Sequence, residues 1–477
     1  MPASEVGTTW SLVTEDRDTV IAALKRGECD GLLPAASGFL DDFATFLNEH
    51  GILSQFEHFP DPRDAHSIAP QFFCNTLLHK GLFRLPRLAD IDQVLFQSPD
   101  VLRRLGFNLR QIHEGFYHGS QQKPFNSEAL ADFFSQIDAQ QLQDHQLELS
   151  RQLLQQFRWL AQDGTVVLDA NTTVVPRGHF KRPGAQVKAC VLGLRAAGRL
   201  FPLLWDFTTG GAGQAADLTQ GKRLLAAARQ AWGEGTIRRL IVDRGFIDGE
   251  WISALKADHI DTIIGLRENM DLCQDMIGLC QLDDATWTVA PPPILHEGVV
   301  PERALCHLQD LNTWDACTVA LQGIVIRDTY PDRVRYQCLV TTDLALTPTQ
   351  LHQYTRDRWS IEESFMDLTR YWPLDKVGSC RPPVARAQIH FLFLAYTLLH
   401  LFACETDQAE ASPLPPPPRL LPGQKVTAYF GDHYTVLWLS ELMTIILDHH
   451  EAWQANREQL LAAQRFCEGH PLPRAPD

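Results

Sequence analysis

The sequence predicts an α/β protein with a mixed sheet flanked by helices, a mostly helical N-terminal domain and a β-rich insertion. Three observations support this fold class. Apolar residues recur at helical spacing through most of residues 1–163. Over residues 164–267, short apolar runs alternate with helical segments in the order three strands, helix, strand, helix, strand. Residues 268–341 contain further β-type runs, at residues 286–290, 317–326 and 333–341, together with three consecutive prolines.

The N-terminal domain, residues 1–163, carries helix-start signals as well as helical periodicity. Ser98 offers a capping hydroxyl before Pro99, which suits the first position of a helix. Asn126 opens another helix, and its apolar side carries Leu130, Phe133, Phe134 and Ile137. Residues 140–160 continue the helical pattern.

The sheet is predicted from the first part of the core, residues 164–267. Its strands are expected at residues 166–168, 186–194, 198–207, 237–242 and 261–266. Helices are expected at residues 249–257 and at residues 214–232, the second with an inner face formed by Leu218, Leu224, Leu225 and Ala228. The first strand ends in Asp169 and the fourth ends at Asp243. This order fits an RNase H-like sheet, although other α/β folds share parts of it.

The C-terminal half completes the predicted organisation. Residues 342–410 form the second part of the core, with a helix that begins at Pro348. The apolar segment Ile389–Cys404 contains two histidines and is shorter than a membrane span, so we expect a buried helix. A proline-rich linker at residues 411–424 leads to a helical C-terminal tail at residues 425–477.

The net charge of −16 argues against a nucleic-acid-binding protein, because neutralising phosphates requires Lys and Arg. The distribution of charge modifies that conclusion. Residues 1–163 hold 13 basic and 22 acidic side chains, whereas residues 164–256 hold 13 basic and 7 acidic ones. The basic stretch therefore surrounds Asp169 and Asp243.

The eleven cysteines are scattered singly along the chain, and the sequence has no CxxC pair. This pattern argues against a zinc ribbon and against a disulfide framework, and it favours reduced thiols in a cytoplasm. The N-terminus shows no basic segment followed by an apolar run, so we expect no secretory signal.

Three carboxylates are candidates for a metal site. Asp169 and Asp243 lie at the ends of strands predicted to be central, where an unpaired buried charge would be costly. Glu362 lies on the helix that begins at Pro348, and it shares a helix face with Tyr354 and Arg358. In-line attack on a phosphodiester builds negative charge on oxygen, and two divalent metals held by carboxylates stabilise that charge. Arg358 is positioned to hold a phosphate or to orient Glu362.

Each of these residues also has a purely structural explanation. Asp169 is typical of a turn at a strand end, and Asp243 could form a structural ion pair with its neighbours. Arg358 and Glu362 are four residues apart, a spacing common in surface ion pairs of modest strength. Glu363 is the competing carboxylate, but its helix face is turned away from Arg358. We favour metal binding because the three carboxylates occur together.

The segment Tyr354–Phe365 resembles the YREK signature of the cut-and-paste insertion-sequence transposases, a DDE family. Arg358, three intervening residues and Glu362 match that signature, within the run Arg-Trp-Ser-Ile-Glu. The segment Ile241–Phe246, which contains Asp-Arg-Gly-Phe, resembles the family's second aspartate motif, and Leu168–Thr173 resembles the first. A β-rich insertion between the second aspartate and the glutamate is likewise a feature of the family.

The chain departs from the signature at two positions. Tyr354 lies one residue too far from Arg358, with Thr355 in the expected place. The closing Lys position is occupied by Thr369, although Arg370 follows it. In the family these positions contact DNA near the transposon end. The resemblance therefore implies that Tyr354, Arg358 and Arg370 bind DNA.

Basic residues near the first two carboxylates are further candidates for DNA binding. They are Arg177, Lys181, Arg182 and Lys188, which follow Asp169, and Arg244, which follows Asp243. A charge cluster is usually a solvated surface, but this one lies beside the proposed site. Trp287 and Trp314 could stack on a flipped base, but ordinary core packing explains them better.

The resemblance covers residues 164–405 and implies a DNA transposase that cleaves transposon ends and transfers strands into target DNA. It implies Mg²⁺ as cofactor, with Mn²⁺ able to substitute, and metal binding by Asp169, Asp243 and Glu362. The expected partners are double-stranded DNA and a second copy of the chain in a synaptic complex, with no membrane. The expected location is the cytoplasm of a bacterial cell, at the nucleoid.

Two alternatives remain at this point. One is a catalytically silent DNA-binding protein derived from a transposase, which the acidic composition and the altered signature favour. The presence of all three carboxylates argues against it. The other is a metal-dependent DNA nuclease that cleaves without strand transfer.

Overall fold

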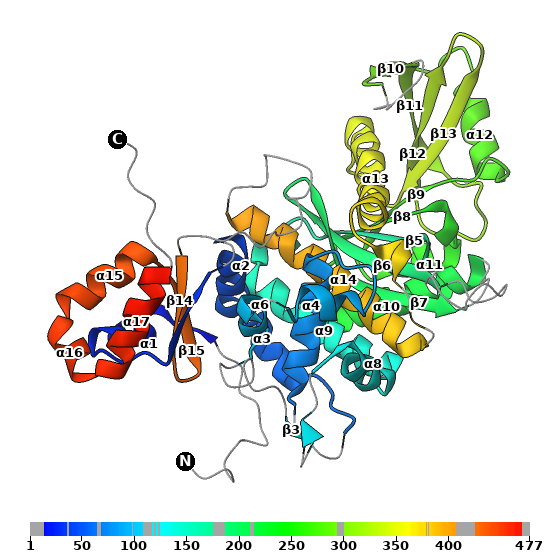
Figure 1. Ribbon diagram of the computed structural model, residues 1–477. Helices are drawn as coiled ribbons and strands as arrows, with labels where there is room; N and C mark the ends of the chain where they lie inside the picture. The colour runs from blue at the N-terminus through cyan, green and yellow to red at the C-terminus, as the bar shows by residue number, and fades with distance from the viewer. Residues whose placement is uncertain are drawn as a thin grey trace. The chain divides into compact units, whose positions relative to one another are not determined.

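The computed structural model describes residues 14–35, 38–63, 68–97, 99–107, 117–118, 121–122, 125–174, 187–209, 214–292, 300–377, 379, 381–406 and 425–469. The chain divides into two compact units (Figure 1). Gln143–Tyr371 form one, which we call the central unit, and Met1–Leu142 with Trp372–Asp477 form the other, which we call the terminal unit. The three candidate carboxylates all lie in the central unit.

A nine-stranded sheet forms the core of the central unit, in the order β10-β11-β12-β13-β9-β8-β5-β6-β7. In chain order, the first five strands of this sheet are β5 (Thr165–Val174), β6 (Val187–Ala196), β7 (Arg199–Thr209), β8 (Arg239–Val242) and β9 (Asp261–Gly265). β6 is antiparallel to β5 and β7, whereas β5, β8 and β9 are parallel neighbours. The predicted mixed α/β fold class is confirmed.

Helices cross over between the parallel strands, as parallel pairing requires. They are α10 (Gln214–Trp232) and α11 (Gly249–Ala257), and their bounds agree with the predicted ones. α10 buries Leu224, Leu225 and Ala228 as predicted, whereas Leu218 is only partly buried. Before β5 come α9 (Ala139–Gln156) and the short 3-10 helix η3 (Arg158–Ala161).

The β-rich segment continues the same sheet. β13 (Val334–Thr341) pairs antiparallel with β9, and the remaining strands follow outward as β12 (Leu321–Thr329), β11 (Glu302–Leu311) and β10 (Trp287–Ala290). β11 and the helix α12 (Asp271–Leu279) were not among the predicted elements. α12 lies against β13, and α13 lies on the opposite side of these strands (Figure 1).

The register of β5 and β8 explains why the two aspartates meet. The last parallel pair joins Leu168 to Val242, so Asp169 and Asp243 come next on adjacent strands. β8 is buried over Leu240, Ile241 and Val242, as expected for a parallel strand covered on both faces. The prediction that the first strand ends at Asp169 was wrong. β5 runs on to Val174 by pairing with β6, with an irregularity in register between Asp169 and Thr172.

The helix that carries Glu362 is α13 (Pro348–Arg370). Thr347 caps its N-terminus in a capping box with Gln350, and Pro348 occupies the first position. An apolar stripe beside the face of Glu362 is buried at Ile361, Phe365 and Leu368. α13 packs against β5, β7, β8, β11 and β12, so it is fixed to both halves of the sheet.

The closest packing behind the two aspartates occurs at Gly221 of α10. A Cβ atom at this position would lie 2.5 Å from the Phe246 ring and 2.9 Å from the Leu168 side chain. Leu168 directly precedes Asp169, and Phe246 closes the 3-10 helix η4 (Arg244–Phe246) that directly follows Asp243. A glycine here lets the helix approach the segments that carry both carboxylates.

A second, four-stranded sheet lies in the terminal unit, in the order β1-β15-β14-β2. Its strands are β1 (Thr14–Glu15), β2 (Gly31–Pro34), β14 (Lys425–Phe430) and β15 (His433–Trp438). Four helices accompany it: α1 (Arg17–Lys25), α15 (Leu439–Asp448), α16 (His450–Ala455) and α17 (Arg457–Gly469). They bury a core around Trp453, Leu24 and Leu442.

This sheet corrects one expectation, because the tail after residue 425 begins with a β-hairpin rather than a helix. The N-terminal region is mostly helical as predicted, but it also contributes the short strands β1 and β2. The physical reason is long-range pairing, because β1 and β2 are completed only by β15 and β14, some 400 residues further along the chain. The predicted linker at residues 411–424 lies outside the described residues.

The other elements of the terminal unit are mostly helical, as predicted. They are α2 (Gly38–Glu49), α3 (Ile52–Gln55), η2 (Phe56–His58), α4 (Pro70–Leu82), α5 (Asp90–Val94), α6 (Pro99–Arg104), α8 (Ser127–Ser135), η5 (Leu374–Lys376), α14 (Pro382–Glu405) and the short strands β3 (Tyr117–His118) and β4 (Gln121–Gln122). Asn126 caps α8 as predicted, accepting a 3.0 Å hydrogen bond from the Ala129 N–H.

α14 is longer than the predicted Ile389–Cys404 segment, and by length and composition it could cross a membrane. In the structure 83% of its most apolar window is buried inside the protein. It packs against α2, α4 and α8, and Phe391 meets the rings of Phe56 and Phe134, each at 5.8 Å. The prediction of a buried helix is therefore confirmed.

Candidate active site

Asp169 and Asp243 lie side by side at the ends of the paired parts of β5 and β8. Asp169 is only 1% exposed, and its Oδ1 accepts a 2.6 Å hydrogen bond from the Ala170 N–H. Its Oδ2 is buried without a hydrogen-bond partner. Burial, and after it the nearby Asp243, raise the pKa of Asp169 to about 7. Asp243 is partly exposed, and its Oδ2 accepts a 3.2 Å hydrogen bond from the Gly245 N–H.

Helix α13 contributes the third carboxylate, Glu362, together with Arg358 one turn earlier. A single guanidinium nitrogen of Arg358, Nη1, lies 2.8 Å from Glu362 Oε1 and 3.2 Å from Asp243 Oδ1. The same nitrogen lies 4.0 Å from Asp169 Oδ2. The structure therefore brings all three predicted carboxylates around one cation. Glu363, the competing carboxylate, is exposed on another face of α13.

A turn role for Asp169 and a surface ion pair between Arg358 and Glu362 would explain only part of this geometry. Asp169 lies within a strand, so it is not a turn residue. The i,i+4 ion pair between Arg358 and Glu362 exists, but Arg358 also reaches carboxylates on two other elements. A surface pair would be solvated, whereas here the side chains of Arg358 and Glu362 are 20% and 28% exposed.

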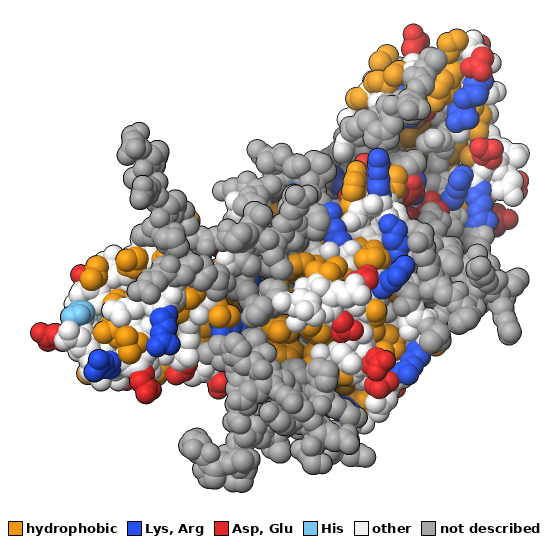
Figure 2. All heavy atoms as spheres, viewed as in Figure 1, with side chains coloured by type: hydrophobic (Ala, Val, Ile, Leu, Met, Phe, Trp, Pro, Cys, Tyr) orange, Lys and Arg blue, Asp and Glu red, His pale blue; other side chains and the backbone are white. Residues whose placement is uncertain are grey.

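A cavity of about 940 Å³ opens beside this cluster inside the central unit. Asp243, Arg244, Tyr354, Arg358 and Glu362 line one part of it, and residues of β8, β9, β13 and α12 line most of the rest. On the face drawn in Figure 2, Lys and Arg side chains lie over the region of α13 and the outer strands, with Asp and Glu among them. A polyanion would meet mixed charges there, with arginines at the carboxylate cluster.

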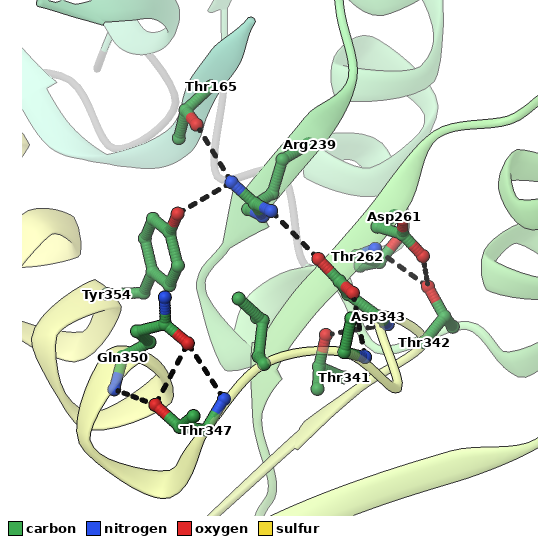
Figure 3. A network of polar contacts seen from close by, with 12 residues as sticks. Thr165, Arg239, Asp261, Thr262, Thr341, Thr342, Asp343, Thr347, Gln350 and Tyr354 are labelled. Atoms are coloured by element: carbon green, nitrogen blue, oxygen red, sulfur yellow. Dashed lines mark hydrogen bonds and ion pairs between the residues drawn. The ribbon is translucent and has the colours of Figure 1, made fainter. Parts of the chain in front are cut away.

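Tyr354 lies two turns before Glu362 and bonds to the sheet. Arg239 of β8 donates a 2.6 Å hydrogen bond to the Tyr354 hydroxyl, and its guanidinium lies 4.7 Å from the centre of the Tyr354 ring. The same guanidinium bonds Asp343 Oδ2 at 2.8 Å, so it lies between the helix and the strand ends (Figure 3). Arg239 and Asp343 were not predicted as site residues, because nothing in the local sequence indicates a partner more than 100 residues away.

Of the other predicted DNA-binding residues that the structure describes, only Arg244 lines the cavity. Its backbone carbonyl accepts hydrogen bonds from Arg267. Arg370 is exposed at the C-terminal end of α13, with its guanidinium 5.4 Å from the centre of the Tyr371 ring. Lys188 lies on β6, paired with Thr173 and Thr208. Arg177, Lys181 and Arg182 lie outside the described residues. In the β-rich segment, the Arg327 guanidinium lies over the Trp287 ring, with its Cζ 4.0 Å from the ring centre.

The three carboxylates suit a hard divalent cation, because they offer oxygen ligands only. The buried Asp169 Oδ2 without a hydrogen-bond partner is the specific observation that supports this fit. As they stand, no three His, Cys, Asp or Glu side chains among the described residues are grouped closely enough to hold a metal ion. The structure has free thiols at Cys29, Cys74, Cys273, Cys280, Cys306, Cys317 and Cys338.

A mixed sheet of this order, with two aspartates on adjacent parallel strands and a glutamate on the covering helix, defines an RNase H-like domain of the DDE class. Residues 163–398 match the family model of the transposase DDE domain. The chain therefore belongs to the DDE-class insertion-sequence transposases, as the resemblance implied. No curated protein matches the chain significantly. Because transposases act on DNA, the family implies DNA binding.

A double-mutant cycle on Arg239→Gln and Tyr354→Phe should reveal coupling between α13 and β8. We expect a coupling free energy of about 0.5–3 kcal/mol in urea unfolding, because both side chains are partly buried and in direct contact. The matched control is the exposed pair of Arg229 and Asp258, which should couple by less than about 1 kcal/mol. Coupling in the Arg239 and Tyr354 cycle no larger than in the control would contradict this anchoring role.

Asp169→Asn should change how stability depends on pH in metal-free buffer. The folded pKa of Asp169, about 7, lies above its ordinary value of 3.8. Its stabilising contribution is therefore present below pH 4 and lost as pH rises through 7. The variant cannot titrate, so its free energy of unfolding relative to wild type should increase between pH 4 and 7, by on the order of 2–4 kcal/mol. The exposed Asp258→Asn variant is the control, and a difference independent of pH would refute the assignment.

Proposed function

We propose that the protein cleaves DNA at the ends of a mobile element and joins the freed 3′-hydroxyl to target DNA, in a reaction that depends on a divalent metal. The observation that supports this most is the convergence of Asp169, Asp243 and Glu362 around Arg358 Nη1. Three separate elements supply these carboxylates, and one of them carries a buried oxygen with no hydrogen-bond partner. Such a group is costly unless a cation or proton balances it.

In this proposal Asp169, Asp243 and Glu362 hold Mg²⁺, for which Mn²⁺ substitutes. Bound there, the metal would activate the attacking oxygen and stabilise the charge on the leaving oxygen. The protein's own contribution is to fix the carboxylates on rigid elements. β5 and β8 hold the aspartates in parallel register, and the Arg239 contacts hold α13.

DNA would lie along the cavity beside the carboxylates. Arg358 and Arg244 line that cavity, and a planar guanidinium matches the geometry of a phosphate. We propose that Lys188, Arg370 and the predicted residues Arg177, Lys181 and Arg182 add backbone contacts. Tyr354 keeps its proposed DNA contact only through the part of its surface that faces the cavity, because its hydroxyl is bonded to Arg239.

The domain roles are also proposals. The region before the core would recognise element ends or contact a second copy of the chain in a synaptic complex, and the C-terminal tail would assist assembly. Since β1 and β2 share a sheet with β14 and β15, these two segments would act together. The setting would be the nucleoid of a bacterial cell.

The test is cleavage and joining of a DNA duplex that carries the element's own ends, with Mg²⁺ and with EDTA. Wild type should give metal-dependent products, and Asp243→Asn and Glu362→Gln should each lose at least about 100-fold in rate. Glu363→Gln is the matched control, because Glu363 is a carboxylate on the same helix but exposed on another face. It should retain activity.

The outcomes separate the alternatives. Cleavage without joined products would favour a nuclease. Binding of the ends without any cleavage would favour a silent DNA-binding derivative. Equal loss in Glu363→Gln and Glu362→Gln would contradict the assignment of Glu362.

A further inference from the structure

We propose that Arg358 is a built-in counter-ion that keeps divalent metal out of the site until DNA binds. In the free protein its guanidinium would hold the three carboxylates. A DNA phosphate would then draw the guanidinium away and free the carboxylate oxygens for metal. This inference rests on the proposed function, and it goes further by making metal uptake depend on DNA.

The contacts of Arg358 support a direct competition with metal. Its Nη1 lies 2.8, 3.2 and 4.0 Å from one oxygen of Glu362, Asp243 and Asp169 respectively. The oxygens that would ligate a cation are therefore already gathered around a nitrogen that carries positive charge. A metal held by these carboxylates at about 2.0–2.1 Å would require them to draw closer together, and it would take the place that the guanidinium nitrogen occupies. Two cations cannot share that place, so one must leave before the other binds.

The position of Arg358 also offers it an alternative partner. The residue lines the cavity of about 940 Å³, so its side chain has a path away from the carboxylates. Phosphate accepts two parallel hydrogen bonds from a guanidinium, and this bidentate arrangement is among the strongest that an arginine forms. The backbone of Arg358 need not move, because Arg239 and the buried stripe at Ile361 and Phe365 fix α13.

The guanidinium balances the carboxylates incompletely. A single positive charge faces three carboxylates, and Asp169 Oδ2 receives no hydrogen bond from it at 4.0 Å. A doubly charged metal would compensate the cluster better once the arginine has left. By linkage, any factor by which DNA raises metal affinity must equal the factor by which metal raises DNA affinity.

The test measures Mn²⁺ binding by the full-length protein, using the electron paramagnetic resonance signal of free Mn²⁺ and no DNA. Arg358→Gln should bind Mn²⁺ about tenfold more tightly than wild type, or better. Arg358→Lys keeps the charge and should stay close to wild type. Arg335→Gln removes the same charge from the same cavity at an exposed position away from the carboxylates, and should change affinity by less than about threefold.

Adding a 30-base-pair duplex should raise the Mn²⁺ affinity of wild type, after subtraction of Mn²⁺ bound by the duplex alone, and should leave Arg358→Gln nearly unchanged. In the Arg358→Gln variant, the further substitution Asp243→Asn should abolish the gain in Mn²⁺ affinity over wild type. If wild type without DNA binds Mn²⁺ as tightly as Arg358→Gln, the counter-ion role is wrong while the metal site stands. If Arg358→Gln binds no Mn²⁺ and wild type cleaves no DNA, both this inference and the proposed function fail.

Discussion

The structure of the candidate site depends on one electrostatic constraint, which is the repulsion among Asp169, Asp243 and Glu362 and its compensation by a cation. Arg358 supplies that cation, through a nitrogen close to all three carboxylates. Burial strengthens both the repulsion and the attraction, because charges in a low-dielectric environment are poorly screened. Burial, and after it the nearby Asp243, raise the pKa of Asp169.

Rigid elements of the central unit hold the three carboxylates close together despite their repulsion. The parallel register of β5 and β8 places two aspartates at the same edge of the sheet, and Gly221 lets α10 pack closely behind them. α13 is capped at Thr347 and bound to β8 through Tyr354 and Arg239, so Glu362 arrives from a fixed direction. The outer strands β10–β13 extend the same sheet and line the cavity, which connects the family's β-rich segment to the site.

Local signals predicted the elements near the site well. The apolar run of β8 and the helical periodicity of α10, α11 and α13 act within a few residues, so these elements could be predicted. The three carboxylates were predicted from strand ends and one helix face, with help from the family resemblance. Long-range features were missed: β1 and β2 need partners near the C-terminus, and Arg239 meets Tyr354 and Asp343 only in the folded chain. The ion pairs of Arg358 with the two aspartates likewise depend on side-chain packing that no local pattern encodes.

Whether Asp169, Asp243 and Glu362 together bind a metal can be determined by mapping the metal position on the protein itself. Fe²⁺ is loaded in place of Mg²⁺ in the presence of duplex DNA, and ascorbate with peroxide generates radicals that cut the backbone beside the bound ion. We expect the backbone cuts to cluster near Asp169, Asp243 and Glu362. Excess Mg²⁺ should suppress these cuts, and the Asp243→Asn variant should lack them. Cuts confined to other segments, or unchanged by Asp243→Asn, would contradict the claim that these carboxylates form one metal site.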